Sequence, residues 1–197
     1  MGEKSVQKKQ YIIETAKKVF MEKGYKNVTM KDIVEACDIS RGGLYLYFES
    51  TAAIFEEVLK MESEEQDDVF EGNVTQETPV TDILLMFLKE QKKELLLHKN
   101  DLAIAEYEFY FENYKNKELR EAYPKKKFDQ AVETLTSLVE EGIRDGEFYE
   151  VDAQWVARHI MFLIEGMKVS SQTMGITEEM VDREFADIVQ NLVVEEE

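Results

Sequence analysis

The sequence predicts an all-α protein in two parts: an N-terminal three-helix, helix-turn-helix head over residues 1–50 and a larger antiparallel helical body over residues 51–197. Only two prolines and nine glycines occur in the 197 residues, and the long stretches between them carry apolar residues at helical spacing. Capping residues stand where several helices are expected to begin. The length suffices for a small head and a body of ordinary domain size, without a third domain.

The run from Thr29 to Phe48, TMKDIVEACDISRGGLYLYF, predicts two short helices joined by a three-residue turn. Thr29 is the expected N-cap of the first helix, and Asp32 stands at the capping-box position, where each side chain can accept a hydrogen bond from a free backbone amide. The turn is expected at residues 37–39. The buried side of the first helix is expected to consist of Ile33, Val34 and Ala36.

The second helix of this run is expected to begin after Ser40, a suitable N-cap. Leu44 and Phe48 lie four residues apart and therefore share one face, which we expect to be the inner one. Two glycines in a first helical turn cost about 1 kcal/mol each relative to alanine, so folding alone gives no reason for them, whereas close approach of the backbone to a ligand does. The outer face, the one that a DNA groove would meet, carries Gly42, Gly43 and Leu46, flanked by Tyr45 and Tyr47.

At these residues the chain resembles the TetR family of transcriptional regulators. The resemblance extends upstream through residues 12–29, including the Gly24-Tyr25 stop after the first helix, and downstream through residues 48–59. It implies a bacterial, cytoplasmic, DNA-binding regulator that acts as a homodimer, with a body that binds a small-molecule effector and forms the dimer interface. One departure is Thr51, because the family usually has a lysine there, just after the serine that begins its fourth helix.

The resemblance, carried over position by position, implies that Thr29 and Tyr45 contact phosphates. It implies that Lys31, Arg41, Gly42, Gly43 and Tyr47 lie at or near base edges. Arg41 can donate two hydrogen bonds to O6 and N7 of a guanine, and Leu46 can touch a thymine methyl group. For Tyr47 the alternative is that it only covers the small core. Thr51 can donate to a phosphate but carries no charge, so the salt dependence should be shallower. The candidate DNA-binding residues are Thr29, Lys31, Ser40, Arg41, Gly42, Gly43, Tyr45, Leu46, Tyr47 and Thr51.

The net charge of −18 is unevenly distributed along the chain. Residues 1–60 hold 10 Lys and Arg against 9 Asp and Glu, whereas residues 61–197 hold 14 against 33. Within residues 4–48 the balance is 9 basic to 5 acidic. A local basic patch can bind DNA while an acidic body discourages non-specific adhesion. The acidic excess is equally compatible with an ordinary solvated surface.

Four further helices are expected before residue 146. Thr78 is the expected N-cap of the second of them, followed by a proline at its first position. Pro124 should kink the last one or begin it afresh. The expected spans are Ser50 to about Asp68, about Pro79 to His98, about Leu102 to Tyr114, and a long segment that ends near Asp145-Gly146.

The segment from Gly146 to Met167 also resembles the body of TetR-like regulators, in which this helix and the last one form the dimer interface. The last helix carries an apolar stripe at four-three-four spacing, a pattern that packs helix on helix. The alternative is burial of this stripe within the monomer. A two-fold dimer would read a palindromic operator with half-site centres about 34–36 Å apart, or a multiple of that. The candidate interface residues are Ile160, Ile164, Val181, Phe185, Ile188 and Leu192.

The stretch from Glu106 to Tyr114, EYEFYFENY, is the most suggestive one for the effector pocket. Aromatic rings beside carboxylates can hold a flat or cationic ligand by stacking, cation–π contact and charge. The alternative is that aromatic residues at helical spacing belong to the core. The candidate ligand-binding residues are Met86, Tyr107, Tyr110, Phe111, Tyr114, Phe128, Trp155, Phe162 and Met167.

Catalysis finds little support in the sequence. His98 and His159 are the only histidines, and they do not have the spacing of a helical metal-binding pair. No nucleophile elbow or phosphate-binding glycine loop occurs. Cys37 is expected in the core and excludes an internal disulfide because it is the only cysteine. We therefore expect no enzyme and no cofactor or metal, and, without a signal peptide or long apolar run, a cytoplasmic protein without a membrane span.

These observations together predict a ligand-gated repressor. The dimer would occupy double-stranded DNA at an operator, and a small molecule in the body would change the spacing of the two heads through the fourth helix, residues 50–68. Two alternatives remain open. One is a TetR-like activator, and the other is a helical interaction module that no longer reads DNA, for which Thr51 and the Glu195–Glu197 tail are the only support.

Overall fold

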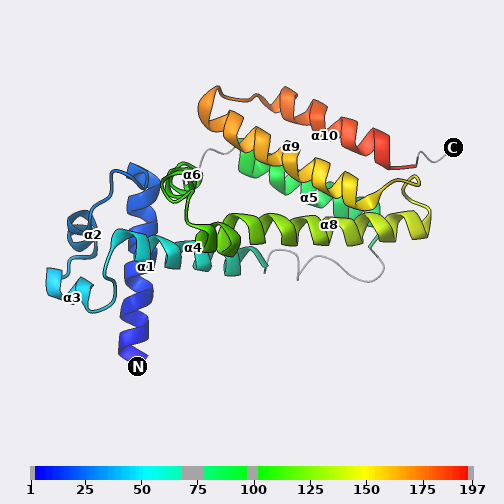
Figure 1. Ribbon diagram of the computed structural model, residues 1–197. Coiled ribbons are helices and arrows are strands. Elements are labelled where there is room, and N and C mark those ends of the chain that lie inside the picture. The colour runs from blue at the N-terminus through cyan, green and yellow to red at the C-terminus, as the bar shows by residue number, and fades with distance from the viewer. Residues whose placement is uncertain (1–2, 68–77, 97–101, 195–197) are drawn as a thin grey trace. The chain divides into compact units, whose positions relative to one another are not determined.

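The computed structural model describes residues 3–67, 78–96 and 102–194. These residues form ten α-helices and one π-helical turn, and no strand occurs among them (Figure 1), which confirms the predicted all-α class. The chain packs into two compact units. The N-terminal unit comprises residues 1–72 and 100–123, and the C-terminal unit comprises residues 73–99 and 124–197.

The N-terminal unit is built around its first helix. Helix α1 (Glu3–Lys23) packs against α2 (Met30–Cys37), α4 (Thr51–Asp67) and α6 (Leu102–Glu112), and the short α3 (Arg41–Tyr45) packs against α2. A four-residue helix, α7 (Lys117–Arg120), follows α6. The compact unit that contains the first three helices therefore extends beyond residue 50, because α4, α6 and α7 belong to it as well. The functional division at residue 50 stays a prediction.

An aromatic cluster joins α6 to the core of the N-terminal unit. The ring of Phe109 on α6 lies 4.9 Å from that of Tyr25 and 5.0 Å from that of Phe55 on α4, and Phe20 on α1 lies 4.8 Å from Phe55, measured between centroids. Phe20, Phe55 and Phe109 are completely buried. Rings in tilted and edge-to-face contact add to the free energy of burial, so α6 is an integral part of this unit.

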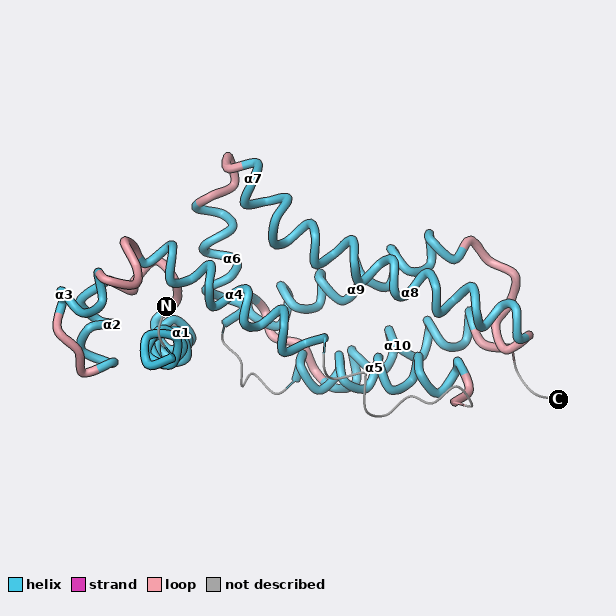
Figure 2. The backbone as a smooth tube through the Cα atoms, turned by 90° about the horizontal axis from the view of Figure 1, so that it is seen from below, coloured by secondary structure: helices cyan, strands magenta, loops and turns pink. Residues whose placement is uncertain are grey.

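The C-terminal unit consists of four long helices. These are α5 (Val80–Leu96), α8 (Lys126–Asp145), α9 (Ala153–Thr173) and α10 (Glu178–Leu192). Helices α8, α9 and α10 follow one another in alternating directions, and α5 packs against all three (Figures 1 and 2). Pro124 lies in the π-helical turn Glu121–Lys125 directly before α8, so the long segment begins afresh there, as one of the two expected outcomes.

The turn between α8 and α9 fixes three elements of the C-terminal unit. Gly146 ends α8 with a φ of 77°, in the left-handed region that favours glycine. The carboxylate of Glu147 accepts hydrogen bonds from the free amides of Val80 (3.0 Å) and Thr81 (2.8 Å) at the start of α5. Burial raises the pKa of Glu147, but these hydrogen bonds outweigh it, and the pKa lies below its ordinary value. Phe148 is buried against Gly142 of α8, where a side chain would collide with its ring.

Several expected helix boundaries differ in detail. Helix α5 begins at Val80, with its first amides bound by a carboxylate from a distant turn, and α6 ends at Glu112, two residues before Tyr114. The expected helix ends at Asp68 and His98 lie outside the described residues. Among the helices that are described, none has an apolar stretch long enough to span a membrane.

Candidate nucleic-acid interface

The start of α2 is held by a capping box, as the sequence predicts. The Thr29 hydroxyl accepts a hydrogen bond from the Asp32 amide (3.3 Å), and the Asp32 carboxylate accepts one from the Thr29 amide (2.8 Å). The Thr29 hydroxyl also donates to Asp32, and Lys23 forms an ion pair with it at 2.5 Å. The hydrogen bonds from Lys23 and then Thr29 hold the pKa of Asp32 well below its ordinary value. A phosphate at Thr29 would therefore compete with Asp32 for the hydroxyl proton.

The turn between α2 and α3 is fixed by local hydrogen bonds. Asp38 ends α2 with a φ of 51°, in the left-handed region that Asp and Asn tolerate better than most residues. The Ser40 hydroxyl accepts a hydrogen bond from the Gly43 amide at 3.1 Å, which confirms Ser40 as the N-cap of α3. Cys37 is the last residue of α2 and is buried, as predicted, whereas Ala36 is exposed and the prediction that it is buried is wrong. Ala36 lies on the solvent side because Ile33 and Cys37, four residues apart, face the core.

Helix α3 has one buried face and one open face. Leu44 in α3 and Phe48, three residues after the helix ends, are both buried, which confirms the inner face, and the C-cap Leu46 is 82 % exposed. A Cβ atom added to Gly42 would meet no atom within 4 Å. The fold thus gives no steric reason for glycine at this position, and an approaching surface remains the physical explanation.

Two side chains of α3 act as a pair on the open face. The guanidinium of Arg41 lies over the ring of Tyr45, 5.6 Å from its centroid. Tyr45 is 44 % exposed and Arg41 is exposed as well, so both groups remain accessible. A cation–π contact of this kind limits the rotamers of the arginine before it meets a base.

The remaining candidate DNA-binding residues differ in their exposure and in the contacts of their side chains. Lys31 is exposed, with Glu35 at 3.5 Å. Tyr47 is half-buried and packs against the core. This position fits both of its expected roles, which are to lie near a base edge and to cover the small core. Thr51 begins α4, and its side chain is hydrogen-bonded to the phenol of Tyr25, whose pKa is raised mainly by burial.

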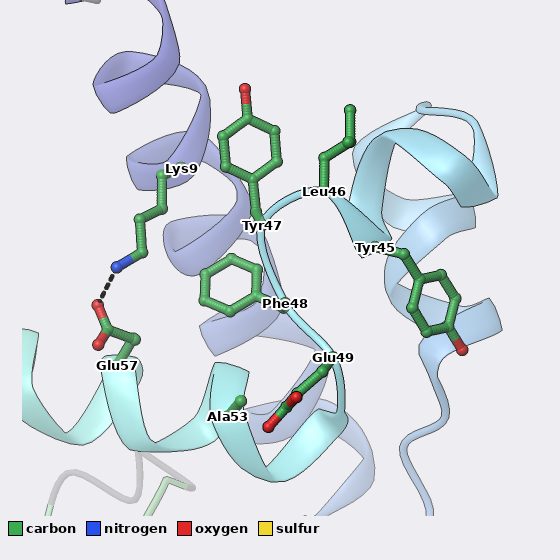
Figure 3. A pocket seen from close by; sticks show the side chains of 8 residues that line it. All are labelled: Lys9, Tyr45, Leu46, Tyr47, Phe48, Glu49, Ala53 and Glu57. Atoms are coloured by element: carbon green, nitrogen blue, oxygen red, sulfur yellow. Dashed lines mark hydrogen bonds and ion pairs between the residues drawn. The ribbon is translucent and has the colours of Figure 1, made fainter. Parts of the chain in front are cut away.

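A surface hollow of about 380 Å³ adjoins the open face of α3 (Figure 3). Helix α1 contributes Lys9, whose ammonium group points to the carboxylate of Glu57 on α4, and the segment after α3 forms the opposite side. The lining residues are Lys9, Tyr45, Leu46, Tyr47, Phe48, Glu49, Ala53 and Glu57.

The nine candidate ligand-binding residues are divided between the two units. In the N-terminal unit, Tyr107 and Tyr110 are half-buried, whereas Phe111 and Tyr114 are 70 % and 58 % exposed. The other five belong to the C-terminal unit, where they do not form one cluster. Met167 is a core residue, Phe128 and Phe162 pair with their centroids 5.0 Å apart, and Met86 and Trp155 are exposed.

All six candidate dimer residues are buried within the C-terminal unit. Their exposed fractions range from 0 % to 8 %, so packing within the chain accounts for the apolar stripe of α10. Another stripe on α9 is exposed: Trp155 (63 %), Phe162 (62 %) and Val169 (44 %) follow one another at seven-residue spacing. The ring of His159 stacks on Trp155 at 5.2 Å. Sequence spacing alone did not separate the two stripes, since both have helical periodicity.

The acidic residues of the chain do not form a metal site in the described residues, where no group of three or more His, Cys, Asp or Glu side chains has a suitable arrangement. His98 lies outside these residues, and His159 is exposed on α9.

Both parts of the chain match families of known proteins. Residues 12–58 match the family of bacterial regulatory proteins of the tetR type, and residues 83–182 match the tetracyclin repressor-like C-terminal domain. The HTH-type transcriptional regulator YfiR of Bacillus subtilis is 34 % identical over 140 residues, 71 % of this chain and 67 % of that protein.

Two further proteins are similar to the chain. IcaR of Staphylococcus aureus, the HTH-type negative transcriptional regulator of the biofilm operon icaADBC, is 32 % identical over 82 residues, 42 % of this chain and 44 % of that protein. The structure of a transcriptional regulator from Saccharomonospora viridis in complex with choline has a TM-score of 0.84 at 21 % identity, covering 96 % of this chain and all of that one. The chain belongs to the TetR family of bacterial regulatory proteins and is a DNA-binding transcriptional regulator.

Proposed function

We propose that the chain is a repressor that binds a palindromic operator through the open face of α3 and is released by a small molecule. The observation that carries this proposal is the surface of α3, where Leu46 is 82 % exposed and Gly42 is free of steric contacts. A helix with this open face fits the major groove, which admits an α-helix and presents a distinct pattern at each base pair. Negative regulation is supported by the similarity to IcaR.

A homodimer would use the exposed face of α9 together with α10. The stripe of Trp155, Phe162 and Val169 is apolar and open to solvent, and Gly166, also exposed, would permit close approach of a second helix. Large exposed aromatic residues that occur together mark interfaces more often than ordinary surface. Two heads related by this symmetry would read half-sites about 34–36 Å apart, or a multiple of that.

The effector that fits the exposed residues at the end of α6 and just after it best is an organic cation. Phe111 and Tyr114 are exposed aromatic side chains, and Glu112 is an exposed carboxylate between them. Aromatic faces and carboxylates together attract cations. The complex of the similar Saccharomonospora viridis regulator with choline, a quaternary ammonium compound, is consistent with this class of ligand.

Helix α6 also offers a route from the effector to the DNA-binding surface. The Glu108 carboxylate accepts a hydrogen bond from the Lys26 amide at 3.0 Å, within the turn between α1 and α2. Phe109 packs against Tyr25 of the same turn and against Phe55 of α4. A shift of α6 would therefore act directly on the turn that precedes α2 and on α4, so α6 adds to the role expected of α4. To switch the protein fully, the effector must prefer the released state by about 5.5 kcal/mol.

The first test is selection of duplexes from a random DNA pool by the purified protein at near-physiological salt. An enriched palindrome is the expected result. No enrichment by a folded dimer would refute operator reading and favour the interaction module, and operator binding that small organic cations leave unchanged would refute the proposed effector class. The position of the operator relative to the promoter then separates a repressor from an activator.

Two variants test the assignment of α3. Arg41→Ala should weaken binding by about 1–3 kcal/mol and relax base preference at one position of each half-site. Gly42→Ala should leave the fold as stable or slightly more stable, since the added methyl group meets no atom, and should weaken operator binding because the backbone is held farther from the DNA. Unchanged affinity and base preference for both variants would show that this face does not read the operator.

A further inference from the structure

The hollow beside α3 contains one cation and two carboxylates. Lys9 is the only basic residue that lines it, and Glu49 and Glu57 line it as well. A hollow with this balance would repel a phosphate unless the ammonium group of Lys9 is directed toward it and the charge of Glu57 is neutralised elsewhere.

Glu57 is held by two lysines at once. The ammonium group of Lys9 lies 2.6 Å from its Oε2 atom, and that of Lys60, one turn along α4, lies 2.7 Å from its Oε1 atom. The side chains of Lys9 and Lys60 are 35 % and 52 % exposed. Lys60 can therefore remain paired with Glu57 when Lys9 turns away, so the release of Lys9 leaves no unpaired carboxylate in this partly buried site.

The position of the hollow places Lys9 beside the path of the DNA backbone. Its rim is formed by Tyr45, Leu46 and Tyr47, at the end of the helix that would enter the major groove. The major groove is about 12 Å wide, so a helix seated in it is flanked on both sides by phosphates. The segment that follows α3 therefore faces one of these strands.

We propose that Lys9 binds a backbone phosphate of the operator and that Glu57 restrains it in the free protein, so that this ion pair lowers the affinity for DNA. The inference rests on the proposed function of α3. In the free protein the Lys9 stem lies against Phe48, with its ammonium group 5.6 Å from the ring centroid. On binding, the ammonium group exchanges Glu57 for the phosphate, and Glu57 keeps Lys60 as its partner.

The test measures operator affinity against salt concentration for the full chain. Lys9→Gln removes one phosphate contact, so the slope of log Kobs against log salt becomes shallower by about 0.9, with base preference unchanged. Glu57→Gln releases Lys9, and the affinity should rise about two- to fivefold, which corresponds to the modest strength of an ion pair that water still reaches. In the double variant this gain should disappear, because Lys9 is needed for it.

A matched pair in the C-terminal unit controls for net charge. Lys93 and Glu90 on α5 form an exposed ion pair at 2.7 Å, and Lys93→Gln and Glu90→Gln make the same charge changes at residues that do not line the hollow. These variants should leave the slope and the affinity unchanged. Far-UV circular dichroism checks that every variant is folded.

Three results would overturn the inference: an unchanged slope for Lys9→Gln, an unchanged affinity for Glu57→Gln, or an equal gain from Glu57→Gln whether or not Lys9 is present. Each of these presupposes that the wild-type protein binds its operator. Absence of any operator for the wild type would instead refute the proposed function, so the two failures are distinguishable.

Discussion

Substitution of Phe109 by alanine tests whether α6 belongs to the core of the N-terminal unit. The ring is completely buried and lies 4.9 Å from Tyr25 and 5.0 Å from Phe55. Removal of a buried phenylalanine ring typically costs 3–5 kcal/mol, the sum of lost transfer free energy and the cavity that remains. Loss of the aromatic contacts places the expected decrease in the free energy of unfolding near the middle of this range, at about 4 kcal/mol.

The matched control is Phe111→Ala, two residues farther along the same helix. Phe111 is 70 % exposed, so its removal should change the free energy of unfolding by no more than about 0.5 kcal/mol. Urea unfolding followed by far-UV circular dichroism gives both values. The single tryptophan, Trp155, lies on α9, so its fluorescence follows the C-terminal unit separately. An equal, small effect of both substitutions would refute the packing of α6 that is described above.

Two further predictions concern stability. Because Lys23 and Thr29 hold the pKa of Asp32 below its ordinary value, Asp32 contributes stability above its unfolded pKa of about 3.9, and this contribution is lost as the pH falls through the folded value. Asp32→Asn should therefore lower the thermal midpoint at pH 7 more than at pH 3, and an equal loss at both would contradict this. Gly142→Ala should destabilise the chain by about 1–3 kcal/mol, because the methyl group collides with the ring of Phe148. Gly42→Ala, whose methyl group meets no atom within 4 Å, should be neutral or stabilising by up to about 1 kcal/mol, and urea unfolding of both variants measures the difference.

The local structure of the α2–α3 surface is predictable because it depends on interactions within a few residues. A hydroxyl at residue 29 or 40 caps a helix through an amide three residues later, so Thr29 and Ser40 identify the helix starts without knowledge of the fold. The spacing of Leu44 and Phe48 likewise identifies the inner face, and the outer face follows by elimination. The uneven distribution of charge between the two parts of the chain is also predictable, because it requires only a count of the charged residues.

Contacts between distant segments are not predictable in this way. The free amides at the start of α5 are bound by Glu147, 66 residues or more away, and nothing in the sequence near residue 80 indicates this. Lys9 is separated from Glu57 by 48 residues, and only the packing of α1 against α4 brings them together. Such pairs depend on how helices pack, which local spacing does not determine.

The sequence by itself determined that the chain is all-α, that a helix-turn-helix lies in its N-terminal part and that α3 has one exposed face, since caps and helical periodicity are short-range properties. Only the tertiary structure decided which apolar stripes are covered. The stripe from Val181 to Leu192 has the spacing of an interface but is buried against the chain's own helices, whereas that from Trp155 to Val169 remains exposed. Periodicity shows that a helix has an apolar face, but burial depends on the neighbour that packs against it.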